Sequence, residues 1–188
     1  MTEYKIIIVN KPGLFSQNNI SEKYDEIHIL INNVTISSSA FINSQQLKYI
    51  KFADDTKLST NSFYNCINLK IDKLPLIKSI PVACFMNCKN IIKIEIPNTV
   101  MEIEQSAFKN SGLECITLNN GLRFIDKFAF AGTNIRSIIL PKTILRIDET
   151  CFSNCNHLYV IYYYYELTDI ISNLRLQLNP DLDFKCIS

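Results

Sequence analysis

Residues 77–97 read IKSIPVACFMNCKNIIKIEIP, and versions of this stretch recur before and after it with apolar residues in the same places. The recurrence is clearest at six phenylalanines, which are separated by 22, 22, 23, 22 and 22 residues: Phe41, Phe63, Phe85, Phe108, Phe130 and Phe152. A fixed period of this length is typical of solenoid proteins, in which each repeat stacks on the next. The sequence therefore predicts one elongated domain.

Each repeat has a first half that predicts a short helical turn and a second half that predicts a strand. An aliphatic residue stands five positions before each Phe, and the residue directly before the Phe is always small. Ser, Pro, Asp or Glu four residues before the Phe suits the start of a helix, and Asn or Gly two residues after it closes one. Aliphatic residues then recur, and Pro75, Pro97 and Pro141 follow three of them, which favours a short strand that ends there.

Composition and charge exclude several classes of protein. The net charge is +1, which does not favour nucleic acid as a partner. The apolar run Ile6 to Val9 is too short for the core of a signal peptide, and no run approaches the roughly 18 residues of a membrane span. Five of the seven cysteines occupy positions that the repeat fills with small residues, so we expect seven free thiols. We therefore expect a cytoplasmic protein, with the nucleus left open.

The repeats leave a segment at each end of the chain. Residues 1–34 hold two strand-like runs, Tyr4 to Val9 and Ile27 to Ile31, and the second is spaced like a degenerate repeat. These residues predict an N-terminal β cap with a degenerate first repeat. The six repeats follow over residues 35–164.

Residues 165–188 predict a C-terminal cap helix and tail. Within them, Glu166 to Leu178 places apolar residues at the spacing of one helical face. A solenoid needs an atypical element over its last hydrophobic layer, which favours a cap. A helix that binds a partner is the alternative.

The repeat can be written as an aliphatic residue, three or four variable residues, Ala-Phe, two further residues, a small residue, a short gap and then Leu-x-x-Ile-x-Leu-Pro. Residues 84–97, 107–118, 129–141 and 151–162 fit this pattern best, whereas Asp72 stands where other units have Ile at the middle strand position. The pattern resembles the BspA-like (Treponema-type) leucine-rich repeats. The resemblance implies a curved α/β solenoid with a parallel sheet on its concave face and short helical turns on its convex side. Members of that family are known as binding and adhesion modules rather than catalysts.

No set of residues predicts catalysis, a metal site or a cofactor. The histidines, His28 and His157, fall in distant parts of the chain, and the four glycines do not cluster into a phosphate-binding loop. Two Cys-x-x-x-Cys pairs begin at Cys84 and Cys151, but three repeats at roughly 4.8 Å each separate them by about 14 Å, too far for one zinc ion. We therefore expect no enzyme activity.

On each expected strand, the residues between the aliphatic ones point away from the core and form columns across the sheet. The N-terminal half of these columns carries lysines, and the C-terminal end carries apolar and aromatic residues. The candidate partner-binding residues are Tyr49, Lys51, Ile71, Lys73, Lys93, Glu95, Ile139, Val160, Tyr162 and Tyr164. The lysines suit either solubility or an acidic partner. The C-terminal aromatic end suits a partner, a homodimer contact or burial under the terminal helix.

The resulting hypothesis is a non-catalytic intracellular scaffold or regulatory subunit that binds another protein on its concave face or C-terminal end. The alternative is a cell-surface adhesion module exported without a recognisable signal.

Overall fold

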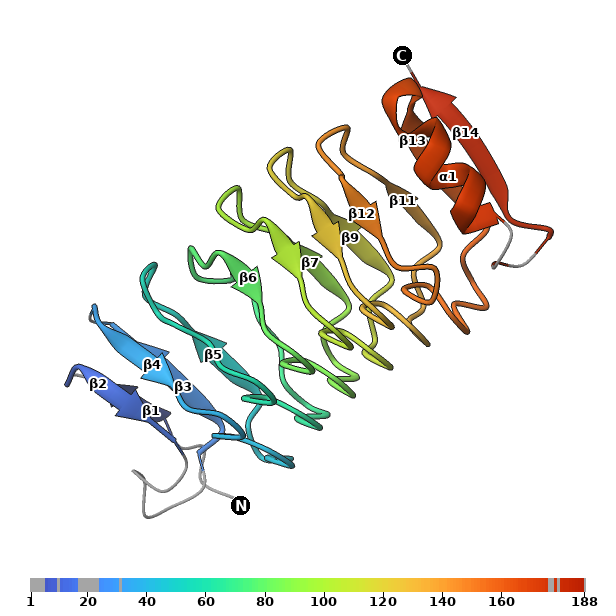
Figure 1. Cartoon of the computed structure of the whole chain (residues 1–188). Helices are drawn as coiled ribbons and strands as arrows, with labels where there is room; N and C mark the ends of the chain where they lie inside the picture. The colour runs from blue at the N-terminus through green and yellow to red at the C-terminus, as the bar shows by residue number, and fades with distance from the viewer. Residues whose placement is uncertain are drawn as a thin grey trace.

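The chain winds into a parallel β-solenoid in a computed structural model that describes residues 6–9, 11–16, 24–30, 32–175, 178 and 180–187. Two rows of strands run along it (Figure 1). The long-strand row contains β1 (Ile6–Val9), β3 (Glu26–Ile29), β5 (Tyr49–Lys51), β7 (Lys93–Glu95), β9 (Cys115–Thr117), β11 (Ser137–Ile139), β13 (Val160–Tyr164) and β14 (Asp183–Ile187). The short-strand row contains β2 (Gly13–Phe15), β4 (Val34–Ile36), β6 (Ser79–Ile80), β8 (Glu102–Ile103), β10 (Phe124–Ile125) and β12 (Arg146–Ile147).

The predicted solenoid and its parallel strands are confirmed, and the short-strand row is an addition to the prediction. Its strands after β2 each end at the aliphatic residue five positions before a repeat Phe, and most have only two residues, too few to show an alternating pattern. The curvature of the solenoid, its concave face, and the division of the chain into cap, repeats and cap stay predictions.

Besides the two rows of strands, the solenoid has a third side, which is a stack of tight turns around the phenylalanines. The sequence predicted short helical turns at this place. In the unit of Phe85, Ala83 and Asn87 have φ angles of 48° and 62°. The same two positions have positive φ in other units: Ser39, Asn43, Asn61, Asn65, Ser106, Asn110, Phe128, Gly132 and Asn154. A left-handed residue every fourth position interrupts an α-helix. The helical prediction is therefore wrong for the repeats, which contain no helix in the part of the chain that the structure describes.

Hydrogen bonding explains why turns replace the helix. The Phe85 N–H donates to the Ala107 carbonyl of the next unit at 2.9 Å, whereas the Cys84 N–H donates back to Pro81 in its own turn at 3.1 Å. In other units too, N–H groups around the Phe alternate between a carbonyl of the next unit and a carbonyl of their own turn. A helix would use every N–H within its own turn, so only the turns can also link neighbouring repeats.

The six repeat phenylalanines fill the centre of the solenoid. Successive rings from Phe41 to Phe152 stack with centroids 5.4–5.8 Å apart and interplanar angles of 4–15°. The neighbouring small positions are tightly packed, and Cys66, Cys84, Cys88 and Cys151 are all fully buried there. The interpretation of these cysteines as small core residues is thus confirmed.

The N-terminal end carries the expected strands. β1 pairs with β3, and β2, which the sequence did not predict, pairs with β4. The expected residues Tyr4, Lys5 and Ile31 lie outside the described part of the chain.

The C-terminal end carries the expected helix and one unexpected strand. A 3₁₀ turn, η2 (Tyr165–Leu167), leads into α1 (Thr168–Arg175), while the expected helix residues 176 and 177 lie outside the described residues. β14 then pairs in parallel with β13. The expectation that only a helix covers this edge of the sheet is therefore wrong. β14 has two charged residues among five, so its sequence lacks the apolar pattern of a buried strand.

Candidate functional site

The candidate site is the outward side of the long-strand row, because its side chains are not used to fill the core. The inward residues Ile27, Ile50 and Ile94 are at most 2% exposed, whereas the outward Ile139 is 55% exposed. The strand registers reproduce the predicted columns, with Glu26 opposite Tyr49, Lys93 opposite Cys115, Glu95 opposite Thr117, and Ile139 opposite Tyr162.

The second repeat interrupts these columns. Tyr49 bridges to Lys70 rather than to Ile71, and among the described residues no strand of the long-strand row forms between β5 and β7. A slip of one residue reverses the two faces of a strand. Ile71 is accordingly only 6% exposed and Asp72 is exposed, the reverse of Lys93 and Ile94 in the next repeat. The expectation that Ile71 faces away from the core is wrong, because the slip spares the Asp72 carboxylate from burial.

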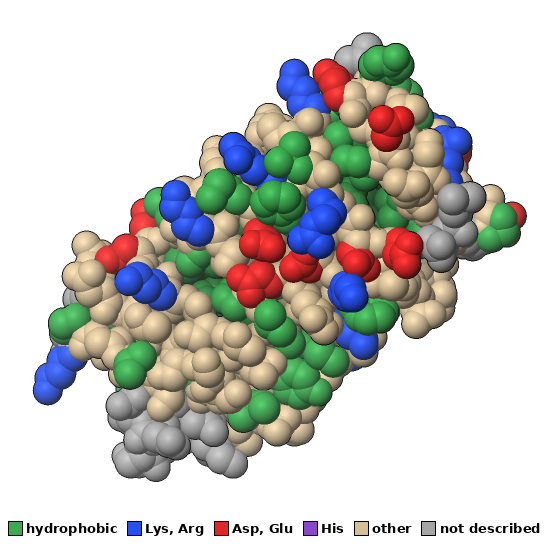
Figure 2. Space-filling model, in the orientation of Figure 1, with side chains coloured by type: hydrophobic (Ala, Val, Ile, Leu, Met, Phe, Trp, Pro, Cys, Tyr) green, Lys and Arg blue, Asp and Glu red, His purple; other side chains and the backbone are tan. Residues whose placement is uncertain are grey.

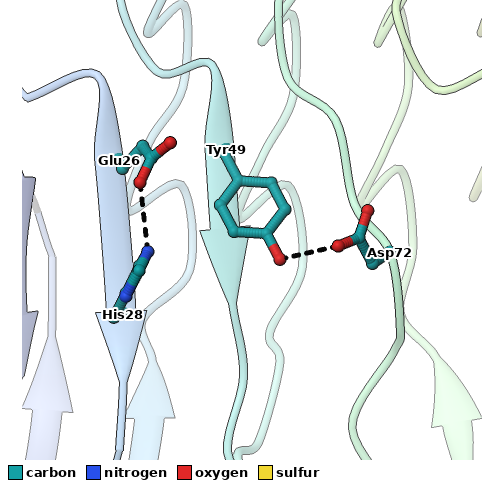
Figure 3. A network of polar contacts seen from close by, with 4 residues as sticks. All are labelled: Glu26, His28, Tyr49 and Asp72. Atoms are coloured by element: carbon teal, nitrogen blue, oxygen red, sulfur yellow. Dashed lines mark hydrogen bonds and ion pairs between the residues drawn. The ribbon is translucent and has the colours of Figure 1, made fainter.

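The slip adds Asp72 to the outward side, where it completes a polar cluster formed by Glu26, His28, Tyr49 and Asp72 (Figure 3). The Tyr49 hydroxyl donates to Asp72 Oδ2 at 2.8 Å, and His28 Nε2 lies 3.1 Å from Glu26 Oε2. The His28 and Tyr49 rings meet edge to face with centroids 6.0 Å apart. Burial, followed by the hydrogen bond and charge of Asp72, raises the pKa of Tyr49. The tyrosine therefore stays a neutral donor to Asp72 at physiological pH.

Exposed lysines surround the polar cluster. Lys73 Nζ pairs with Asp54 Oδ1 at 2.9 Å. Lys51 and Lys93, on the strands either side of the interruption, are exposed and have no ion-pair partner among the described residues. An open depression of about 450 Å³ lies beside Glu26 and Tyr49 of the polar cluster, and its other lining residues are Lys48, Asn68, Lys70 and Asn90. This half of the row thus presents unpaired positive charge beside hydrogen-bonding groups.

The C-terminal patch, formed by Ile139, Tyr162 and Tyr164, is the apolar part of the outward side. Ile139 is exposed and the two tyrosines are half-buried. Val160, which was expected to belong to this patch, is only 2% exposed. That expectation is wrong, because β14 places Asp183 next to Val160 on the side opposite Ser137.

The opposite side of the molecule carries an acidic band, which Figure 2 shows in the middle of the solenoid, over the short-strand row. Its carboxylates bind within the fold: Glu104 accepts from Ser79 Oγ and the Val82 N–H, and Asp126 accepts from Arg146 Nη2 at 2.8 Å. Partial burial and the charges of Asp126 and Glu104 raise the pKa of Glu102. These acids connect neighbouring repeats.

The described residues contain no group of three or more His, Cys, Asp or Glu that could hold a metal ion. Burial raises the pKa of the Cys66 and Cys84 thiols to about 12, which suppresses the nucleophilic thiolate. In the described part of the chain, no helix is long and apolar enough to cross a membrane.

Sequence reasoning named the lysines and Tyr49 but missed Glu26, His28 and Asp72 as members of one cluster. The available signal was Asp72 at a position that is Ile in other repeats. Its consequence, a shift of strand register, depends on packing between three neighbouring repeats.

Comparison with known proteins gives one family match and several structural matches. The family model described as a BspA type leucine rich repeat region matches residues 11–75 and 78–175, in 6 copies. The crystal structure of a leucine rich cell surface protein from Faecalibacterium prausnitzii A2-165 is 22% identical, with a TM-score of 0.69, over 86% of this chain and 48% of that one. The chain thus spans about half the length of that protein, and at this identity the likeness shows the fold.

Two further structures match less well. A leucine-rich repeat protein from Bacteroides ovatus is 19% identical, with a TM-score of 0.43, over 88% of this chain and 61% of that one. A leucine rich repeat protein from T. pallidum is 13% identical, with a TM-score of 0.45, over 96% of this chain and 74% of that one. No curated protein matches the sequence at a significant level.

Proposed function

Because the chain belongs to the family of BspA-type leucine rich repeat proteins, we propose that it is a non-catalytic module that binds another protein. The binding surface in this proposal is the outward side of the long-strand row. The observation that supports this proposal is that the two faces of the strands differ. Inward residues such as Ile94 fill the core, while outward residues such as Lys93 and Ile139 are exposed. Repeated strands that leave one side free provide an extended binding surface.

The two halves of this surface favour different parts of a partner. Lys51 and Lys93, which have no ion-pair partner among the described residues, offer positive charge that complements an acidic segment and accelerates its encounter. Ile139, Tyr162 and Tyr164 offer apolar and aromatic area, which is typical of the centre of protein interfaces. The partner we propose is therefore a protein with an acidic segment next to an apolar one.

Affinity capture with the full chain tests this proposal. The double variant Lys51→Glu, Lys93→Glu should lose a partner that the wild type recovers in stoichiometric amount from an extract of the native cells. Lys142→Glu, an exposed charge reversal outside both strand rows, is the matched control and should keep it. A wild type that recovers no stoichiometric partner contradicts the proposal, as does a partner that the double variant retains.

For the setting of this function, we propose an intracellular scaffold or regulatory subunit. The alternative is a surface adhesion module, and its support is that the F. prausnitzii protein of the same fold is described as a cell surface protein. Protease treatment of intact cells separates the two. A protein that resists the protease until the cells are lysed favours the intracellular setting, and one that is digested on intact cells favours the surface.

A further inference from the structure

β14 is the outermost strand of the long-strand row (Figure 1), and it leaves one backbone edge unpaired. Its Asp183 N–H donates to the Tyr159 carbonyl of the preceding repeat at 3.0 Å. In a parallel pair, alternate residues turn both backbone groups to the same neighbour. Asp183, Lys185 and Ile187 therefore bond toward β13, and Phe184 and Cys186 turn their N–H and C=O groups outward.

The outward edge is free of other strands within the described chain. One side chain reaches it: Arg175 Nη2 donates to the Phe184 carbonyl at 3.4 Å, and its guanidinium lies 4.8 Å from the centre of the Phe184 ring. This hydrogen bond is long and Arg175 is exposed. A backbone N–H of another strand can therefore replace the arginine as donor to the Phe184 carbonyl at little cost in free energy. An uncovered strand edge is a template for pairing with another chain.

The charges on β14 favour a second copy of the same strand as its partner. Asp183 and Lys185 have side chains that are 57% and 54% exposed, and they form an ion pair of 3.3 Å within the strand. In an antiparallel pair of two β14 strands centred on Phe184, Asp183 of each copy lies opposite Lys185 of the other. Two opposite-charge pairs then form at non-hydrogen-bonded positions, where facing residues are closest.

The neighbouring register is less favourable. If the two-fold axis passed through Lys185, the two lysines would face each other at that same close spacing, and like charges opposite each other are destabilising. In the register centred on Phe184, that residue instead forms the hydrogen-bonded pair, and the two half-buried phenylalanine rings lie side by side.

We propose that β14 pairs antiparallel with β14 of a second copy of this chain, centred on Phe184, and so forms a two-fold symmetric dimer with one continuous sheet across it. This places the homodimer contact on the backbone edge rather than on the outward faces of Tyr162 and Tyr164. It does not rest on the proposed function, because the outward side of the row stays free for another protein. A two-fold contact of this kind is self-complementary and closes without forming a fibre.

Sedimentation equilibrium of the full chain, from about 1 µM to several hundred micromolar, tests the dimer. The wild type should associate reversibly. Lys185→Asp and Asp183→Lys should each weaken association by about tenfold or more, since each places like charges opposite each other twice. An equimolar mixture of the two variants should restore it, because each copy then faces opposite charges. The mixture is the critical control, since a variant that had only misfolded would not be rescued by mixing.

Other outcomes overturn the proposal. A wild type that is monomeric at several hundred micromolar excludes the dimer. Association that Asp183→Lys leaves unchanged excludes this register, because the alternative centred on Lys185 does not pair Asp183 with a charge. Association that the Tyr162→Glu, Tyr164→Glu variant abolishes, while both β14 reversals retain it, moves the contact to the C-terminal patch.

Discussion

At the scale of single residues, the repeat is defined by the stacked phenylalanine rings and by the small residues that pack next to them. Successive rings lie 5.4–5.8 Å apart, and the residue directly before each Phe, which is always Ala, Ser or Cys, is at most 3% exposed. Cys88 adds a specific contact, because its thiol donates to the Phe63 carbonyl of the previous repeat at 3.1 Å. The packing of the centre thus explains both the invariant Phe and the high cysteine content.

Replacing Phe85 by alanine should remove one member of the stack. Phe85 is fully buried, with Phe63 and Phe108 rings 5.6 and 5.5 Å away. We expect the free energy of unfolding to fall by roughly 3–5 kcal/mol, since the repeats on either side cannot close the cavity. Urea unfolding measures the change. Tyr165→Ala, at a side chain that is 80% exposed, is the control and should stay within about 0.5 kcal/mol of the wild type. A similar small loss for Phe85→Ala would contradict the role of the stack.

The buried thiols predict a loss of stability at alkaline pH. Burial raises the pKa of Cys66 and Cys84 from 9.0 to about 12. Between these values the unfolded chain releases thiol protons that the folded chain keeps, so the stabilisation is complete below pH 9 and is lost as the pH rises toward 12. Urea unfolding from pH 7 to pH 11 should show the decline.

A cysteine variant separates this effect from the titration of other groups. Cys84→Ala introduces the residue that Phe108 and Phe130 already have beside them, Ala107 and Ala129. Its free energy of unfolding should fall less steeply above pH 9 than that of the wild type. Equal slopes for the two proteins would show that the buried thiol does not titrate with unfolding.

At the scale of elements, one polar residue determines where the long-strand row is interrupted. Asp72 lies at an inward position of the repeat, and the chain turns it outward by pairing Tyr49 with Lys70. The N–H groups of residues 71–74 consequently form no backbone hydrogen bond with either neighbouring strand in the described structure. The hydrogen bond between Tyr49 and Asp72 in the polar cluster exists because of this interruption.

Exchanging the pattern at residues 71 and 72 should restore the strand. The double variant Ile71→Lys, Asp72→Ile copies Lys93 and Ile94 of the next repeat. We expect amide hydrogen exchange at residues 71–74 to slow by about tenfold or more, because these groups would join the ladder between β5 and β7. Ile71→Lys alone is the control and should destabilise the chain, since it buries a lysine in the slipped register. Unchanged exchange in the double variant would show that the slip does not depend on Asp72.

The sequence was sufficient to predict the elements that repeat and insufficient for those that occur once. The period of the phenylalanines predicted the parallel strands of the long-strand row and the registers of β3 with β5, β7 with β9 and β11 with β13, but not the short-strand row. The turns were mistaken for helix because Asn or Gly two residues after Phe was visible, whereas the left-handed residue two before it is Ser, Asn, Ala or Phe and gives no common signal. β14 and the position of Ile71 depend on contacts with neighbouring repeats, which no local pattern encodes.

At the scale of the whole molecule, each repeat is stabilised by its contacts with the neighbouring repeats. The elements at the two ends of the solenoid therefore affect the stability of all the repeats. At one end β1 pairs with β3 and β2 with β4, and at the other η2, α1 and β14 follow β13. Leu167, Ile171 and Leu174 are each only 2% exposed, which shows that the C-terminal segment contributes its own layer to the core.

Removing residues 165–188 should therefore destabilise the chain as a whole. The deletion uncovers the inward Ile161, which is fully buried, and leaves β13 as an open edge. We expect a lower unfolding temperature and aggregation detected by light scattering, because unfolding of the last repeat removes the interface that supports the one before it. Removing only residues 180–188 is the matched control, since α1 still covers the core, and it should lower the unfolding temperature less. If both deletions unfold at the wild-type temperature, the repeats are stable without a C-terminal cap.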